Sequence, residues 1–221
     1  MCSTRTRLGW FLLLVGAVGL VLFSSRYFSR DPDVYFPRQR EVYIAHSTAL
    51  IIHIDAMVPA ALLGPFQFLR PLRERYPLVH RMTGRVYLLA ALVGALGGLY
   101  LAPYSASGLV SDVSFTLLGL GVLFTSATAY LRIRAGNVQS HREWMTRSYS
   151  LIFAAVTLRV YSAPLELLFG EQYGYALVAW LCWVPNLLVA EWLIRGPLRA
   201  RPEPPLTNIP ATPSDGHPSL A

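Results

Sequence analysis

The chain has 221 residues, of which 54% are hydrophobic and 14% are charged, and its mean hydropathy is +0.42. Soluble domains carry about 25% charged residues, so this composition argues against a soluble protein. The net charge is +7 and every cationic residue is an arginine, but the arginines cluster between apolar segments instead of covering one solvated face. This distribution argues against a nucleic-acid partner and predicts that the main partner is a lipid bilayer.

Six segments are apolar over about 20 residues, the length that crosses roughly 30 Å of hydrocarbon. In chain order they are residues 8–23, 44–69, 84–104, 113–133, 146–169 and 173–194. We therefore predict an all-α fold, a six-span transmembrane helical bundle whose core membrane domain covers residues 43–199.

The two ends of the chain differ from this core. The first apolar segment ends in VLFSSRYF, which has no small-x-small cleavage pattern, so residues 1–24 are predicted to be a retained signal anchor. Residues 25–42 are then predicted to form an extracytoplasmic loop. Residues 200–221 are rich in proline and lack apolar periodicity, which predicts a disordered tail.

The arginines predict the orientation of the spans. They precede the first span, follow the sixth, and fill the loops after the second and fourth, whereas the loops after the third and fifth contain none. By the positive-inside rule, both termini and both arginine-rich loops are cytoplasmic. Residues 24–41 carry four arginines on the opposite side, diluted by three acidic residues. We expect a cell membrane of the bacterial inner-membrane type.

The two arginine-rich loops resemble each other. One ends in HRMTGR from His80 and the other in HREWMTR from His141, and each leads into an outward-going helix. The second and third spans would form one hairpin, and the fourth and fifth spans another in parallel orientation, as in a duplicated helical hairpin. In that arrangement His80 and His141 occupy equivalent positions. Ser140 and Glu143 also match a capping box, with Ser140 as N-cap and His141 as the first helical residue.

Three interpretations of this histidine pair remain open. In the first, the imidazoles are axial ligands of a b-type haem iron and nearby guanidinium groups hold its propionates. In the second, the same groups bind a phosphate, a lipid headgroup or another anion. In the third, they only anchor helices at the membrane surface. The residues involved are His80, His141, Arg81, Arg85, Arg142 and Arg147.

A second polar set lies within the spans and comprises His46, His53, Asp55 and Arg159. His46 and His53 are seven residues apart and share one helix face, while Asp55 points roughly the other way. Ionisable groups on two faces predict a central helix, because charges facing lipid are costly. We predict that Arg159 pairs with Asp55 across the membrane core, with Glu166 as the other candidate partner.

Other residues predict where helices touch or end, and absent motifs limit the enzyme classes. Gly94 and Gly98, with the small residues of the fifth span, predict close helix contacts, and Pro59 and Pro65 predict a kink or an end of the second span. The sequence contains no nucleotide-binding loop, serine-nucleophile elbow or HExxH motif, so no catalytic residue is assigned.

The sequence resembles a bacterial and fungal family of multi-pass membrane proteins of unknown function. The resemblance covers roughly residues 43–195 and rests on GPFQF from Gly64, HRxxGRxY from His80, HRxWMxRSY from His141 and AAVTLR from Ala154. It implies membership but no reaction. Paired histidines on antiparallel spans are also similar to the ascorbate-reducible di-haem membrane cytochromes, although a second ligand pair is incomplete. The open functions are a haem-linked electron carrier or oxidoreductase, a binding or transport protein for an anionic or lipid-like molecule, and a structural accessory subunit.

Overall fold

The computed structural model describes residues 4–29 and 31–196, so the predicted tail lies outside the described residues. The described chain is helical and contains no strand, which confirms the all-α prediction. In chain order the elements are α1 Thr4–Ser24, η1 Ser25–Ser29, η2 Pro32–Val34, η3 Pro37–Gln39, α2 Arg40–Ala45, α3 Ser47–Gln67, α4 Arg70–Arg75, α5 Pro77–Leu101, η4 Ala102–Tyr104, α6 Leu109–Arg134, α7 Val138–Ile152, α8 Ala154–Phe169, α9 Glu171–Leu181 and α10 Val184–Arg195.

Six helical segments are long and apolar enough to cross a membrane, which confirms the predicted number of spans. The third and fifth of these begin earlier than predicted, because Pro77 starts α5 and Asn137 caps α7 ahead of the apolar stretches. The polar turns that contain His80 and His141 are therefore helical. The predicted capping box is wrong, because the Asn137 side chain accepts the N–H of Ser140 and Glu143 instead accepts a hydrogen bond from Gln139.

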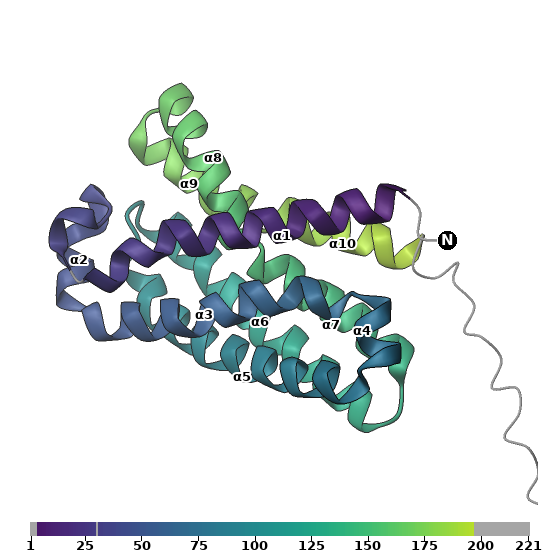
Figure 1. Ribbon diagram of the computed structural model, residues 1–221. Coiled ribbons are helices and arrows are strands. Elements are labelled where there is room, and N and C mark those ends of the chain that lie inside the picture. The colour runs from purple at the N-terminus through teal and green to yellow at the C-terminus, as the bar shows by residue number, and fades with distance from the viewer. Residues whose placement is uncertain (1–3, 30, 197–221) are drawn as a thin grey trace, which may run out of the picture.

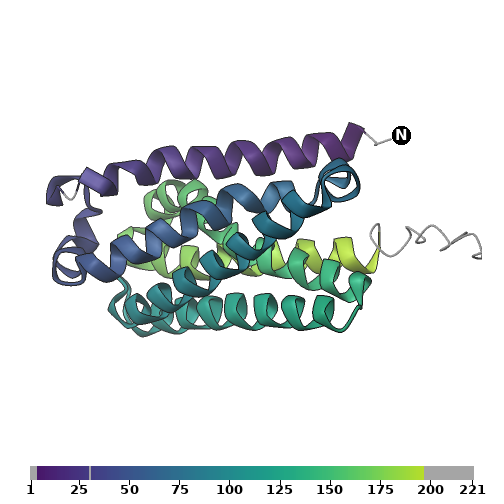
Figure 2. The same ribbon diagram turned by 60° about the horizontal axis from the view of Figure 1, so that its bottom comes forward.

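The helices form an elongated bundle in which two hairpins lie side by side (Figures 1 and 2). Helix α3 packs along α5, and α6 packs along both α5 and α7. Small residues allow the α3–α5 contact: a Cβ atom on Gly94 would lie 2.6 Å from Met57, and one on Gly97 would lie 3.1 Å from His53. This confirms the close helix contacts predicted around Gly94 and Gly98.

Helix α1 lies along the outside of this bundle, against α3 and α8. The indole N–H of Trp10 donates to the carbonyl of Pro65 at 2.8 Å, and Gly16 allows α1 to approach Phe153. Helix α3 continues through both Pro59 and Pro65 to Gln67, so neither proline ends the helix at its own position. The carbonyl of Pro65, near the end of the helix, finds its partner on α1.

Two of the spans are interrupted near their middle. Phe153 separates α7 from α8, and Cys182 and Trp183 separate α9 from α10. In Figure 1 the α8–α9 hairpin rises away from the long axis of the bundle. The amide of Asn186 donates to the Cys182 carbonyl at 2.8 Å and to the Thr157 hydroxyl at 3.0 Å. Such side-chain bonds satisfy backbone groups that a broken helix leaves open.

The arginine-rich end of the bundle contains α4, the turn from α6 to α7 and the end of α10. The far end contains the segment from η1 to α2, together with η4 and the turn at Gly170 between α8 and α9. The side chain of Arg38 bonds Glu171 at this far end, and the Ser107 hydroxyl donates to the carbonyl of Gln172. These contacts join the segment from η1 to α2, the turn after η4 and the turn at Gly170 next to the candidate site described below.

Candidate functional site

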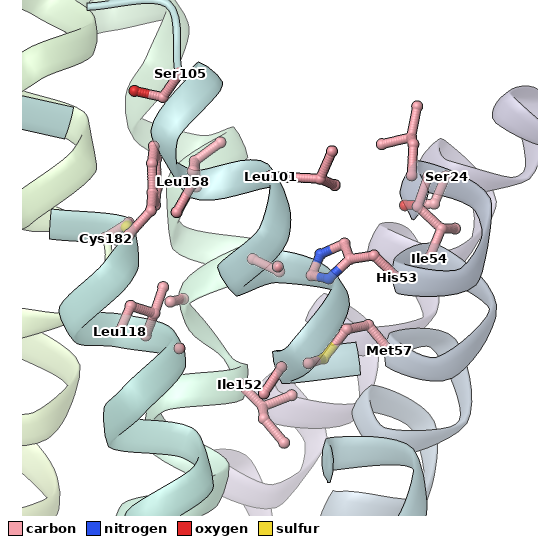
Figure 3. A pocket seen from close by; sticks show the side chains of 18 of the residues that line it. Ser24, His53, Ile54, Met57, Leu101, Ser105, Leu118, Ile152, Leu158 and Cys182 are labelled. Atoms are coloured by element: carbon pink, nitrogen blue, oxygen red, sulfur yellow. The ribbon is translucent and has the colours of Figure 1, made fainter. Parts of the chain in front are cut away.

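A cavity of about 260 Å³ lies inside the half of the bundle nearer the far end. Its walls come from α1, α3, α5, α6, α8 and α9, and most of its lining is aliphatic. The polar side chains that line it are Ser24, Tyr27, Gln39, Tyr43, His53, Ser105, Arg159, Tyr175 and Cys182. Figure 3 shows part of this wall, with Ser24, His53, Ser105 and Cys182 among aliphatic side chains. No aspartate or glutamate is among the lining residues.

Arg159 supplies the charge of the cavity. Its guanidinium donates through Nη1 to the carbonyl of Ala155 at 2.7 Å and lies 5.1 Å from the ring centre of Phe23. Its Nε is fully buried and has no hydrogen-bond partner among the described residues. Arginine stays protonated in proteins, so the cavity contains a positive charge with an unused donor.

The predicted ion pair of Arg159 is wrong. Asp55 is exposed on the outer face of α3 and does not line the cavity. Glu166 does not replace it, because no ion pair joins Glu166 to Arg159 among the described residues, and its Oε1 is buried without a hydrogen-bond partner. Depth along the membrane normal was the basis of the predicted pairing, but depth does not say which way a side chain points around its helix axis.

Three tyrosines interact electrostatically with the guanidinium of Arg159. Tyr27, Tyr43 and Tyr175 lie within electrostatic range of Arg159, and the Tyr175 hydroxyl accepts a hydrogen bond from Gln39 at 3.1 Å. Burial raises the pKa of the Tyr43 hydroxyl above its usual range, so this group stays protonated and can donate. These tyrosines were not predicted as site residues, because aromatic residues near the end of a span are commonly membrane-interface residues.

The segment from η1 to α2 covers the far end of the cavity. Tyr27, Tyr35 and Tyr43 pack together in it, with Tyr27 and Tyr35 stacked at 5.9 Å between ring centres. Arg38 ties the segment to α9 by donating to both the backbone carbonyl and the carboxylate of Glu171, each at 2.5 Å. The segment predicted as a loop is thus an ordered cover built from short helices.

His53 is the histidine of the cavity wall. Its Nδ1 lies 2.7 Å from the carbonyl of Gly94, and in Figure 3 its imidazole points from its own helix toward the side chains across the cavity. The carbonyl fixes the proton on Nδ1 and leaves Nε2 as an acceptor. His46 lies outside the cavity lining, where it bonds the Tyr100 hydroxyl at 3.0 Å and stacks on Tyr104.

The His80–His141 pair lies at the arginine-rich end, apart from this cavity. The two imidazoles are within electrostatic range of each other. Nδ1 of His141 is 2.8 Å from the carbonyl of Ala129, whereas Nδ1 of His80 is buried without a partner. Nε2 of His141 is therefore the nitrogen that can accept a proton or a metal. No group of three potential metal-ligating side chains occurs among the described residues.

The four arginines assigned to this pair differ in their surroundings. Arg81 and Arg85 are exposed, and the Nε of Arg142 is buried without a partner. Arg147 forms a two-bond ion pair with Glu191 on α10, at 2.5 and 3.1 Å, and its guanidinium lies 4.5 Å from the Trp144 ring centre. A group bound between the histidines would thus have to compete with Glu191 for Arg147.

Comparison with known proteins identifies one match. Residues 50–194 match the model of a family described as a predicted membrane protein, DUF2306. No curated protein and no solved structure matches the chain. The matched range begins at Leu50 in α3 and ends at Ile194, one residue before the end of α10. It contains both HR turns and Arg159.

Proposed function

Because the chain belongs to the predicted membrane protein family DUF2306, whose description names a location and no reaction, we propose a function from its cavity: it binds a small anionic amphiphile within the membrane. The observation that carries this proposal is the Arg159 guanidinium, which lies in a cavity without a carboxylate and has a buried, unpartnered Nε. A buried charge without a counter-ion is costly. An anionic ligand would remove that cost.

The chemistry around Arg159 supports an oxygen-bearing anion. A guanidinium offers a planar set of N–H donors that fits carboxylate and phosphate oxygens. The protonated hydroxyl of Tyr43 adds a further donor close by. These groups lie where α1, the cover segment and α8 meet, so we expect the head of the ligand at the far end of the cavity.

The remaining wall supports an apolar body for the ligand. Aliphatic side chains line the rest of the cavity, among them Leu20, Ile54, Met57, Leu118, Val122 and Leu158. Typical small-molecule pockets measure about 300–1,000 Å³, so a cavity near 260 Å³ suits a short chain better than a two-chain lipid. A medium-chain carboxylate has the required head and size.

The distribution of arginines supports a proposed placement of this function in the cell. The ends of α4, α6, α7 and α10 are rich in arginine, whereas the far end carries acidic residues beside its arginines. We expect the arginine-rich end in the cytoplasm by the positive-inside rule. The cavity and its cover would then face the extracytoplasmic side of a bacterial inner membrane.

Binding of decanoate to the protein in lipid nanodiscs tests this proposal by isothermal titration calorimetry. We expect decanoate to bind at least about tenfold more tightly than its neutral methyl ester, since a charge-assisted pair contributes about 1.5–3 kcal/mol. Arg159→Gln should remove that difference and Arg159→Lys should retain part of it. Equal binding of acid and ester to the wild-type protein would contradict the proposal.

Arg26→Gln is the matched control for the charge. The Arg26 guanidinium lies 4.0 Å from the centre of the same Phe23 ring that Arg159 contacts, but Arg26 does not line the cavity. Its removal changes the net charge of the chain by the same amount as Arg159→Gln. Decanoate should therefore bind to Arg26→Gln as it does to the wild-type protein.

One observation favours a second candidate function, a haem-linked electron carrier that uses the pair His80 and His141. The carbonyl of Ala129 holds Nδ1 of His141 and leaves its Nε2 available, as second-shell bonds do for ligating histidines. Haem b bound there would supply one-electron chemistry. A reduced-minus-oxidised absorption spectrum of protein expressed with sufficient haem tests this: Soret and α bands should appear and should vanish in His80→Ala and His141→Ala. Absence of bands in the wild-type protein would reject this candidate.

A further inference from the structure

Asp55 presents a carboxylate to the outside of the bundle from the middle of a membrane-spanning helix. It lies eight residues after the start of α3 and twelve before its end, or about 12 and 18 Å from those ends at 1.5 Å per residue. Both distances fall well inside a hydrocarbon core of roughly 30 Å. The residue is exposed, whereas its neighbour Ile54 is buried at 8% exposure.

The exposed part of α3 is a narrow stripe around this carboxylate. Thr48, Ile52 and Asp55 are exposed and follow each other at helical spacing, while the rest of the helix between residues 47 and 61 is half-buried or buried against its neighbours. Ile52 retains 47% of its exposure. The stripe is the part of α3 that is left open by its contacts with α1, α5 and α7.

No group among the described residues neutralises the carboxylate. Among the described residues, no ion pair joins Asp55 to an arginine. The two flanking helices have no arginine at this depth, because those of α5 lie in its first turns at the arginine-rich end and Arg26 follows the end of α1. A charged side chain that faces lipid costs about 2.5–3.5 kcal/mol or more at the bilayer centre.

A second copy of the chain cannot supply the missing cation. Copies that meet through the same stripe would bring two carboxylates together, which is repulsive. Copies that meet through different faces would need an exposed arginine at mid-depth, but the described arginines lie near the two ends of the bundle, apart from Arg159 in the cavity and Arg147 in its pair with Glu191. A cation at this depth has to come from a different molecule.

We infer that the α3 stripe around Asp55 is the docking surface for a membrane-spanning helix of another protein, one that carries a lysine or arginine at the centre of the bilayer. Charge complementarity at low dielectric makes one such pair strong, and the small Thr48 beside Ile52 lets a helix approach closely. The partner helix would lie along the exposed stripe of α3. This surface is separate from the cavity, so the inference stands independently of the proposed function.

A synthetic transmembrane helix tests the inference directly. Its sequence is leucine and alanine with one central lysine, and it carries a fluorescence donor, while the protein carries an acceptor on an added C-terminal tag. In phosphatidylcholine vesicles at pH 7, energy transfer should show at least about tenfold stronger association than for the same helix with leucine in place of the lysine. Asp55→Asn should reduce association to the level of the leucine helix.

Two controls make each outcome decisive. Asp33→Asn removes a carboxylate that is exposed outside the spans, and it should leave association with the lysine helix unchanged. Decanoate binding to Asp55→Asn should also match that of the wild-type protein, which shows that the variant is folded and separates this inference from the cavity function. Equal association of the lysine and leucine helices, or Asp55-dependent energy transfer between two copies of the chain, would overturn the inference.

Discussion

The hydroxyl of Tyr87 on α5 lies 2.7 Å from the hydroxyl of Ser148 on α7, and both residues are fully buried. Ser148 is in turn 2.8 Å from Ser126 on α6, so one short chain of hydroxyls joins three helices. Tyr87 and Ser148 each lie seven residues after the histidine that opens their HR turn. The two hairpins are thus joined by a polar contact two helical turns beyond His80 and His141.

Tyr87→Phe is expected to lower the free energy of unfolding by about 1 kcal/mol, because one buried hydrogen bond is lost while the ring remains. Ser148→Ala breaks both bonds of the chain and should cost more, up to about 3 kcal/mol. Thermal unfolding of the detergent-solubilised protein without denaturant, followed by circular dichroism, compares the variants. A double variant no less stable than Ser148→Ala alone would show that the two groups act through the same bond, and additive losses would contradict this.

Gly64→Ala is expected to destabilise the protein more strongly than its size suggests. A Cβ atom at Gly64 on α3 would overlap the ring of Tyr149 on α7. The Tyr149 hydroxyl donates to the carbonyl of Ala61, also on α3, at 3.1 Å. The ring would have to move, and such overpacking costs about 1–3 kcal/mol. Gly19→Ala on α1 is the matched control, because no atom lies within 4 Å of its added Cβ. The melting temperature should fall for Gly64→Ala and stay constant or rise for Gly19→Ala.

The fold was largely predictable from the sequence and the site was not, and Tyr149 and Arg159 illustrate the reason. The length of the apolar segments determines the number of spans, and the glycines of GPFQF and of Gly94 to Gly98 indicate where helices touch. Direction around a helix axis is harder to predict, since it depends on which neighbours are present. Depth alone suggested a pair between Arg159 and Asp55, but the two side chains lie on different sides of α3.

The interruptions of the two spans were also not predicted, and residues beside them line the cavity. Phe153 carries no sequence signal for a break, because it is neither glycine nor proline. The break at Trp183 does have a signal that was not used, because Pro185 lies in the first turn of α10. The break at Phe153 turns α8 away from the axis of α7 and brings Arg159 to the cavity wall. Histidine and arginine in the HR turns were recognisable as polar groups in the sequence. Tyr27 and Tyr43 belong to the cover segment, so their place near Arg159 depends on how that segment folds over the cavity.

Arg147→Ala is expected to cost about 1–3 kcal/mol of stability, because it leaves the part-buried carboxylate of Glu191 without its two-bond partner. Arg70→Ala is the matched control: its pair with Glu74 is exposed and lies within one helix, so it should contribute at most about 0.5 kcal/mol. Thermal unfolding of the two variants under the same detergent conditions makes the comparison. Equal losses would show that the contact between α7 and α10 is not a specific tie.

Arg38→Ala is expected to speed the exchange of a bound ligand. Arg38 fastens the cover segment to α9 through two hydrogen bonds to Glu171, and a ligand that enters from the far end has to part these elements. Opening of such a cover often limits the rate of release, so the dissociation rate of decanoate should rise several-fold. The equilibrium constant should change less, because the association rate of decanoate rises too.

Stopped-flow displacement of a fluorescent fatty acid from the protein measures this rate. Arg40→Ala is the matched control, because Arg40 pairs with Asp33 within the cover and does not touch α9. Its dissociation rate should equal that of the wild-type protein. An unchanged rate in Arg38→Ala would place the route of exchange elsewhere, between the helices and open to the lipid, and the cover segment would then act only to hold Tyr27 and Tyr43 beside Arg159.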